Sequence, residues 1–135
     1  GYYKYDENRK RMVDPEIEAL IKAEAEALQI KQRSIPADEI VERCLLRLAN
    51  EGAKILEEGI ALRSSDCDVM YMNGYGFPAW RGGPMWQADN MGLKVVAEKI
   101  KAYEAKYGAR WKCARLIEKL AAEGSSFAEY DKKQK

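Results

Sequence analysis

The chain has 135 residues, of which 47% are hydrophobic and 33% are charged, and its formal net charge is +1. This composition fits one globular domain with part of a neighbour; it excludes general disorder and lacks the basic excess of a nucleic-acid binder. No stretch approaches the roughly 18 consecutive apolar residues of a membrane span, and three widely spaced cysteines give neither a disulfide framework nor a zinc site.

Residues 1–13 combine three tyrosines with a polar turn. They predict a short extended segment followed by a polar connector. Asp14 and Pro15 then supply a capping side chain and a favoured first residue for a helix. We expect this helix at about residues 15–32. Its apolar face is predicted to consist of Ile17, Leu20, Ile21 and Leu28.

The clearest helical pattern lies between residues 40 and 59. Apolar or small residues there advance by three or four and predict one buried stripe. The stripe consists of Val41, Cys44, Leu45, Leu48, Gly52, Ile55, Leu56 and Gly59. Glycine costs about 1 kcal/mol relative to alanine inside a helix. We therefore expect another helix to cross closely at Gly52. All three cysteines are expected to be small core residues.

The remainder of the chain predicts helices separated by glycines and prolines. They are expected at residues 64–73, from Pro84 to about Gly92, at 93–107, and around 116–120. The segment from residue 127 is polar, and we expect it to be frayed. The predicted fold is an all-α bundle with a short extended N-terminal segment. Its predicted domains are residues 1–13 as a tail and linker, 14–130 as the helical domain, and 131–135 as a frayed tail.

Residues 74–83, GYGFPAWRGG, cannot be regular structure. They hold a GxG, but Ala79 replaces the third glycine of a dinucleotide fingerprint, and a helix rather than a strand precedes them. We therefore predict a structural loop with Phe77, Trp80 and Trp86 anchored in the core. Arg81 is expected to cap a helix carbonyl or to pair with Asp89. The loop residues are Gly74, Gly76, Phe77, Pro78, Trp80, Arg81, Gly82, Gly83 and Pro84.

Catalytic chemistry is poorly supported by the residue types present. The sequence has no histidine, which removes the Ser-His-Asp triad, the Cys-His pair and the imidazole base. Glu51 has no obvious partner acid, base or metal. The polar pair Asn50-Glu51 is instead expected to hydrogen-bond across to the loop backbone.

Two segments carry a family resemblance: ERCLLRLANEGAKILEEGIA (residues 42–61) and DCDVMYMNGYGFPAWRGGPMWQADNMGL (66–93). They resemble the C-terminal domain of the 3-hydroxyacyl-CoA dehydrogenase family. The motif GFPAWRGGPM resembles, more narrowly, the second copy of that domain in multifunctional β-oxidation enzymes. The opening GYYKYD resembles the end of the first copy. The sequence departs from the family at Trp111-Lys112-Cys113, where a proline is usual.

The resemblance implies a non-catalytic segment. In the family, a His–Glu pair and a Ser of the NAD domain act with an Asn on the long helix of the active copy. That copy resembles I-V-N-R-L-L, whereas residues 40–45 here read I-V-E-R-C-L, so Glu42 stands at the Asn position. A carboxylate cannot donate the amide hydrogen bond, and its charge opposes a developing oxyanion. The resemblance thus implies no catalytic, cofactor-binding or metal residue here, with NAD and enoyl-CoA hydratase activity belonging to the parent enzyme.

The same resemblance implies that this copy packs on the first copy within one chain, in place of a dimer partner. The isolated segment should then expose an apolar patch and self-associate. Two alternatives remain: a direct contribution to acyl-CoA binding through Arg43, Arg81 or Lys94, and a stand-alone helical interaction domain. The ending Lys-Gln-Lys is not a Ser-Lys-Leu-type address, so a cytoplasmic location is expected.

Overall fold

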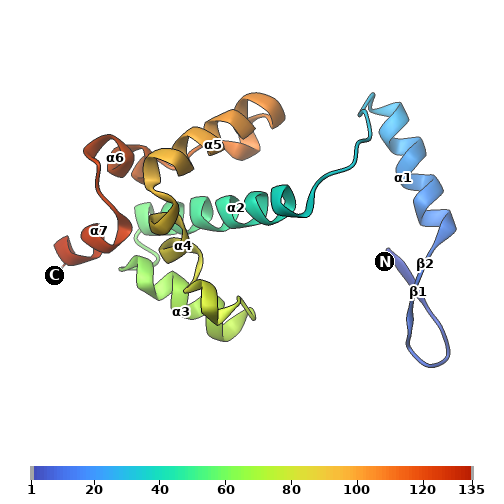
Figure 1. The fold of residues 1–135 in the computed structure, drawn as a ribbon, viewed down its shortest axis with the longest axis horizontal. Helices are drawn as coiled ribbons and strands as arrows, with labels where there is room; N and C mark the ends of the chain where they lie inside the picture. Colours follow the sequence, from blue (N-terminus) through green and yellow to red (C-terminus); the bar gives the residue numbers. More distant parts are fainter. Residues whose placement is uncertain (1, 135) are drawn as a thin grey trace. The chain divides into compact units, whose positions relative to one another are not determined.

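The structure, a computed structural model, describes residues 2–134 of the chain. It divides into two compact units, Gly1–Ile35 and Pro36–Lys135 (Figure 1). Helices dominate both units, and the only strands in the described residues form one small hairpin. The predicted all-α class with a short extended N-terminal segment is therefore confirmed.

The first unit opens with a two-stranded antiparallel hairpin of β1 (Tyr3–Tyr5) and β2 (Arg11–Val13). The Asp6 carboxylate closes its turn by accepting hydrogen bonds from the backbone N–H groups of Asn8 at 2.9 Å and Lys10 at 2.7 Å. The expected polar connector is thus wrong in part, because its last three residues form the second strand. A three-residue strand is too short to show a period of two in the sequence.

Helix α1 (Pro15–Ala27) follows the hairpin, and the Asp14 side chain caps it by accepting from the Glu16 N–H at 3.1 Å. The helix ends before the expected residue 32, because Gln29 adopts a φ of 55°. No apolar side chain of described residues 2–35 is buried. The predicted apolar face of α1 therefore exists as a face, but nothing within its own unit covers it.

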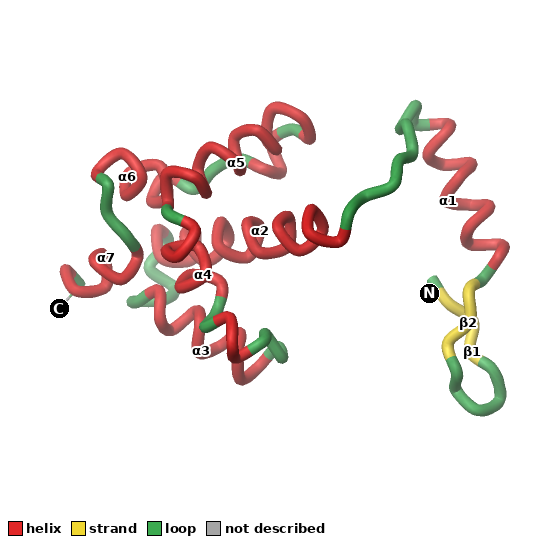
Figure 2. The backbone as a smooth tube through the Cα atoms, in the orientation of Figure 1, coloured by secondary structure: helices red, strands yellow, loops and turns green. Residues whose placement is uncertain are grey.

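The second unit contains six α-helices joined by short loops (Figure 2). These are α2 (Ala37–Glu57), α3 (Ser64–Gly74), α4 (Pro84–Met91), α5 (Leu93–Tyr107), α6 (Arg115–Glu123) and α7 (Phe127–Lys133). Two 3-10 turns lie between them, η1 (Ala79–Arg81) and η2 (Ala109–Trp111). Helix α4 contacts α2, α3, α5 and α7, so it lies at the centre of the packing.

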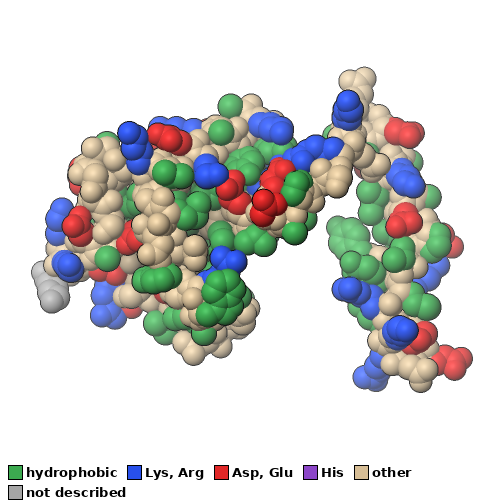
Figure 3. Space-filling view, viewed as in Figure 1, with side chains coloured by type: hydrophobic (Ala, Val, Ile, Leu, Met, Phe, Trp, Pro, Cys, Tyr) green, Lys and Arg blue, Asp and Glu red, His purple; other side chains and the backbone are tan. Residues whose placement is uncertain are grey.

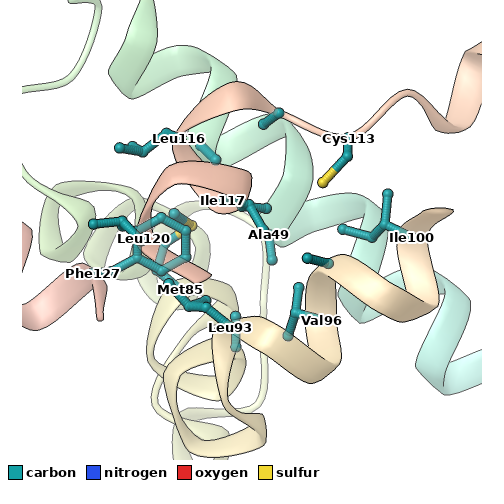
Figure 4. Packing of buried hydrophobic residues seen from close by; sticks show 14 of the residues in the cluster. Ala49, Met85, Leu93, Val96, Ile100, Cys113, Leu116, Ile117, Leu120 and Phe127 are labelled. Carbon is teal, nitrogen blue, oxygen red and sulfur yellow. The ribbon is translucent and has the colours of Figure 1, made fainter. Parts of the chain in front are cut away.

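One hydrophobic cluster joins these helices. Side chains from α2, α4, α5, α6 and α7 meet in it, as Figure 4 shows for Ala49, Met85, Ile100, Ile117 and Phe127. The close approach expected at Gly52 is confirmed. Met85 of α4 packs directly against this glycine, and a Cβ atom there would overlap the Met85 sulfur.

The face that the long helix α2 buries overlaps the predicted stripe only in part, because Gly52 and Leu56 are buried as predicted but other members are not. Its buried residues are Leu46, Ala49, Asn50, Gly52, Ala53 and Leu56, whereas Val41 and Cys44 are exposed. Cys67 and Cys113 are buried, so the core role expected of all three cysteines is wrong for Cys44 alone. Apolar residues occupy two adjoining faces of α2, and spacing alone does not decide which face α4 and α6 cover.

The expectation of a frayed segment from residue 127 is also wrong. Residues 127–133 form α7, whose first residue, Phe127, is completely buried. The Ser126 hydroxyl caps this helix by accepting from the Glu129 N–H at 3.1 Å. A short helix with one deeply buried aromatic residue gives too few apolar positions for a periodicity signal.

Candidate functional site

Glu42 stands on α2 at the position where the family resemblance places a catalytic Asn. Both of its carboxylate oxygens are engaged by side chains of α5. Lys99 Nζ lies 2.6 Å from Oε2, and the Tyr103 hydroxyl donates to Oε1 at 3.0 Å. The hydrogen bond to Glu42 raises the pKa of Lys99. Both oxygens of Glu42 are thus occupied, one by an ion pair and the other by a hydrogen bond to α5.

Arg43, the neighbour of Glu42, is held in the same way. Its guanidinium stacks 4.5 Å from the Tyr107 ring and 5.3 Å from the Tyr103 ring. It also donates to the Tyr107 hydroxyl and to the Glu39 carboxylate. The residues around position 42 thus bind one another, and the beginning of α2 is tied to α5 by side chains alone.

The outer face of α2 carries a short exposed apolar stripe, which includes Val41 and Cys44 from the set that the sequence placed in the core. Ile40, Val41 and Cys44 are exposed along it. A shallow hollow of about 490 Å³ adjoins the stripe and is lined by Arg43, Cys44, Arg47, Leu48 and Trp111. Figure 3 shows hydrophobic side chains gathered on the surface over α2 and over α3. An apolar surface next to two arginines is typical of a contact with another protein surface.

The helix N-terminus that follows the glycine-rich loop is filled by a side chain of the protein itself. The Asp68 carboxylate of α3 accepts from the backbone N–H groups of Met85 at 2.7 Å and Trp86 at 3.0 Å. These are the first N–H groups of α4 after its N-terminal proline. Gly83 has a φ of 99°, and a Cβ atom on it would collide with the Asp68 carboxylate. The absence of a side chain at Gly83 therefore leaves room for the capping carboxylate.

The predicted anchoring of the loop is only partly right. Pro84 is buried and Phe77 is half-buried, with its N–H donating to the Tyr71 carbonyl at 3.1 Å. Trp80 is 76% exposed and Trp86 is 53% exposed, so the expectation that both reach the core is wrong. Met85, which precedes Trp86 in the sequence, is fully buried in the core instead. Other residues of the predicted loop, Gly74, Gly76 and Pro78, are exposed, while Gly82 is half-buried.

Arg81 and Asp89 do not form the pair that the sequence suggested. The Arg81 guanidinium lies 4.3 Å from the centre of the Trp80 ring. The two oxygens of Asp89 accept instead from the backbone of α7. The candidate phosphate binders Arg43, Arg81 and Lys94 are also kept apart. Arg43 lines the hollow beside Trp111, Lys94 lines a different one of about 390 Å³ between α5 and α6, and Arg81 lines neither.

Asn50 hydrogen-bonds to backbone groups, as the sequence predicted, but to a different segment of the chain from the predicted one. It is fully buried, and its amide donates to the Lys112 carbonyl at 2.9 Å and accepts from the Ala114 N–H at 2.9 Å. The backbone it holds is the segment before α6, not the glycine-rich loop. This is the segment where the family's usual proline is absent. A side-chain clamp thus fixes a turn that proline would otherwise restrict.

Asp68 and Lys99 were missed by sequence reasoning. A single acidic residue among polar neighbours gives no sequence signal for burial. The only local indication is that Asp68 lies one helical turn after Ser64 and so shares its buried face. No group of three or more potential metal-ligating His, Cys, Asp or Glu residues occurs in residues 2–134. Within the same residues, no helix is long and apolar enough to cross a membrane.

The chain is similar to one domain family and to longer proteins that contain that domain. A family model described as the C-terminal domain of 3-hydroxyacyl-CoA dehydrogenase matches residues 40–132. The chain is 45% identical over 105 residues to the peroxisomal bifunctional enzyme of Cavia porcellus, covering 76% of this chain and 14% of that protein. Its identity to the Danio rerio enzyme of the same name is 40% over 129 residues, covering 93% of this chain and 18% of that protein.

A plant protein is similar over nearly the whole chain. The peroxisomal fatty acid beta-oxidation multifunctional protein AIM1 of Arabidopsis thaliana is 33% identical over 133 residues, which are 96% of this chain and 18% of that protein. The chain thus spans less than a fifth of the length of these relatives. Their names are peroxisomal, so the expectation of a cytoplasmic location is wrong. The last three residues carried that expectation, and they are too weak a basis for it.

Proposed function

Because the chain belongs to the 3-hydroxyacyl-CoA dehydrogenase C-terminal domain family, we propose that it is a non-catalytic copy of that domain, which packs on the active copy of a multifunctional β-oxidation enzyme. The parent is proposed to oxidise 3-hydroxyacyl-CoA with NAD, to hydrate enoyl-CoA, and to reside in peroxisomes. The names of the relatives support this setting. Residues 1–13 are proposed to end the preceding copy, and the domain to begin near residue 14.

The observation that carries the packing role is the stripe on α2 that its own unit leaves uncovered. Ile40, Val41 and Cys44 are exposed there beside the hollow at Trp111. Burying such a surface contributes about 25 cal/mol per Å² of apolar area removed from water. A neighbouring copy with a matching apolar face is the partner that this chemistry fits, and the isolated chain is proposed to associate with itself through the same stripe.

The ion pair at Glu42 supports the non-catalytic part of the proposal. Lys99 and Tyr103 occupy both carboxylate oxygens, so the side chain serves the packing of α2 on α5. NAD does not fit the described residues either. The glycine-rich loop follows a helix, and Asp68 fills the α4 N-terminus where a phosphate would bind. We therefore propose that no cofactor is bound by this segment and that NAD is held elsewhere in the parent.

The test is a reconstitution of the parent enzyme. The parent truncated before this segment is assayed by NADH oxidation with acetoacetyl-CoA, with and without the 135-residue chain added. The chain alone should show no turnover, and its addition should restore activity or thermal stability to the truncated enzyme. A truncated enzyme that is fully active and stable without the chain would contradict the packing role.

Two equally exposed valines provide a matched comparison for the stripe. Val41 is 43% exposed on α2, and Val95 is 42% exposed on α5, outside the stripe. Val41→Glu should weaken reconstitution by at least about tenfold, because a charge would be buried at the contact. Val95→Glu should leave it unchanged. Equal losses in the two variants would assign the contact to another surface, and saturable acyl-CoA binding by the isolated chain would favour the ligand-binding alternative.

A further inference from the structure

Three buried or half-buried aspartates in the second unit each cap a helix other than their own. Asp68 belongs to α3 and binds the first turn of α4 through the Met85 and Trp86 N–H groups. Asp89 belongs to α4 and binds the first turn of α7. Its two oxygens accept from the N–H groups of Phe127 at 2.8 Å and Ala128 at 3.0 Å.

Asp131 closes the circuit. It belongs to α7 and binds the first turn of α3, accepting from the N–H groups of Ser64 at 2.7 Å and Ser65 at 3.2 Å, and from the Ser64 hydroxyl at 2.8 Å. The caps therefore run from α3 to α4, from α4 to α7 and from α7 back to α3. All three pairs of these helices are in contact, and Figure 1 shows α3, α4 and α7 next to one another in the fold.

This arrangement differs from ordinary capping, in which a residue next to the helix satisfies its first N–H groups. Asp14 and Ser126 are examples in this chain. In the ring, a carboxylate of a second helix binds two N–H groups in the first turn of each helix, in addition to the local caps that α3 and α7 have at Asp66 and Ser126. Each carboxylate also uses both oxygens on two successive N–H groups, which is the favourable position for a negative charge at a helix N-terminus.

The ring brings three aspartate carboxylates close together. Each carboxylate therefore relies on the N–H groups of the helix that it caps to offset its burial and the charge of its neighbours. Burial raises the pKa of Asp68 and of Asp89, and the neighbouring aspartates raise both further. The N–H donors of the capped helices offset that cost. If one helix leaves, a half-buried carboxylate loses its donors while another helix loses its acceptor, and both groups are costly to leave unpaired.

We propose that this ring of caps makes α3, α4 and α7 open and close as one unit, so that α7 acts as a latch on the loop between α3 and α4. The loop, residues 75–83, runs between two members of the ring and carries Tyr75 and Trp80, two of the most exposed aromatic side chains of the unit. Undocking of α7 removes the cap of α3, and the loss passes through Asp68 to the start of α4.

Amide hydrogen exchange on the 135-residue chain tests this coupling. Asp131→Asn removes a charged acceptor that touches only α3, and loss of one cap corresponds to about a fivefold rise in local opening. The ring predicts a rise of that size or more at the Met85, Trp86 and Phe127 amides, which Asp131 does not touch. Amides of α5, such as that of Ile100, should change less. Asp66→Asn is the matched control, because Asp66 binds Arg63 at the start of its own helix, through the N–H and the guanidinium of that residue, and contacts no other helix of the ring through a hydrogen bond.

Either of two other patterns would overturn the proposal. A rise confined to the first turn of α3 would make the three caps independent, and a uniform rise that includes α5 would mean global unfolding. Ser64→Ala removes one bond to Asp131 without removing a charge, and it should give a smaller rise with the same distribution. This second variant keeps the test decisive if Asp131→Asn does not fold.

Combining Asp89→Asn with Asp131→Asn gives an independent measure. In a ring, the second substitution should change the unfolding equilibrium far less than it does alone, because the first has already opened the circuit. Independent caps should instead multiply their fold-changes.

Discussion

The two ends of the second unit are held by different kinds of polar contact. Around α3, α4 and α7, carboxylates bind backbone N–H groups and are buried or half-buried. At the beginning of α2, side chains bind side chains across to α5, with Glu42 and Lys99 both partly exposed to solvent. An amino-acid substitution leaves a backbone N–H partner in place, whereas it can remove or change a side-chain partner. Glu42 lies at the second end, where its charge is neutralised by Lys99.

The largest effect is expected where a side chain would displace a carboxylate from its backbone partners. Gly83→Ala places a Cβ atom on Asp68 at a φ of 99°. We expect a loss of about 4 kcal/mol in the free energy of unfolding, from the positive φ and from the two broken hydrogen bonds. Urea denaturation measures it. Gly76→Ala is the control, because its φ is also positive but nothing lies near its Cβ position; equal losses would remove Asp68 from the explanation.

In the middle of α2, the Asn50 side chain also binds backbone groups of another segment. Asn50→Ala leaves the Lys112 carbonyl and the Ala114 N–H without their partner in a buried place. We expect a loss of about 3 kcal/mol, from two unsatisfied backbone groups and a small cavity. The same denaturation series measures it. A loss below about 1 kcal/mol would show that the turn before α6 is held by its apolar contacts alone.

The pH dependence of stability should come from the buried end. Burial raises the pKa of Asp68 to about 6, from an ordinary value of 3.8. The folded state then binds more protons between these values, so stability rises as the pH falls through this range. From pH 7 to pH 5 we expect a gain of about 1 kcal/mol from this group, and Asp89 shifts in the same direction.

The Asp68→Asn variant isolates this term. Its stability should change less between pH 7 and pH 5 than that of the original chain, as followed by thermal unfolding at several pH values. The pKa values of Asp14 and Asp66 are lowered, so their contribution is lost mainly below 3.8 and does not mask the effect. An unchanged pH profile in the variant would show that Asp68 is not the titrating group.

The smallest effect is expected at the partly exposed end. Lys99→Met removes the partner of Glu42, but the pair is screened by solvent, and such pairs contribute about 0.5 kcal/mol. Chemical denaturation at low and at high salt measures the difference, which should shrink as salt rises. A loss as large as that of Asn50→Ala would contradict the distinction between the two ends.

The sequence predicts those parts of the fold whose signals are local. Helix α5 begins and ends where Gly92 and Gly108 require, and the capping of α1 follows from Asp14-Pro15. The position of Glu42 was found through the motif around it. Its partners Lys99 and Tyr103 could not be, because they come from another helix 57 and 61 residues away. For the same reason the ring of caps leaves no local pattern in the sequence.

The failures have a common physical cause. The face of α2 that becomes core is chosen by α4 and α6, and α7 is fixed by the burial of Phe127 and by Asp89. Each depends on packing between distant segments, which overrides local periodicity. Trp80 and Trp86 show the converse, since large aromatic residues next to a buried methionine can still lie at the surface.

The ring of caps also has a consequence for the order of events during synthesis. A ribosome makes α3 and α4 long before it makes Asp131, so the start of α3 has no partner for its N–H groups until α7 has left the exit tunnel. Contacts between residues 64 and 131 span much of the domain, and such long-range closure is slow. We therefore expect the first turn of α3 to become fully protected during synthesis only after α7 has been made.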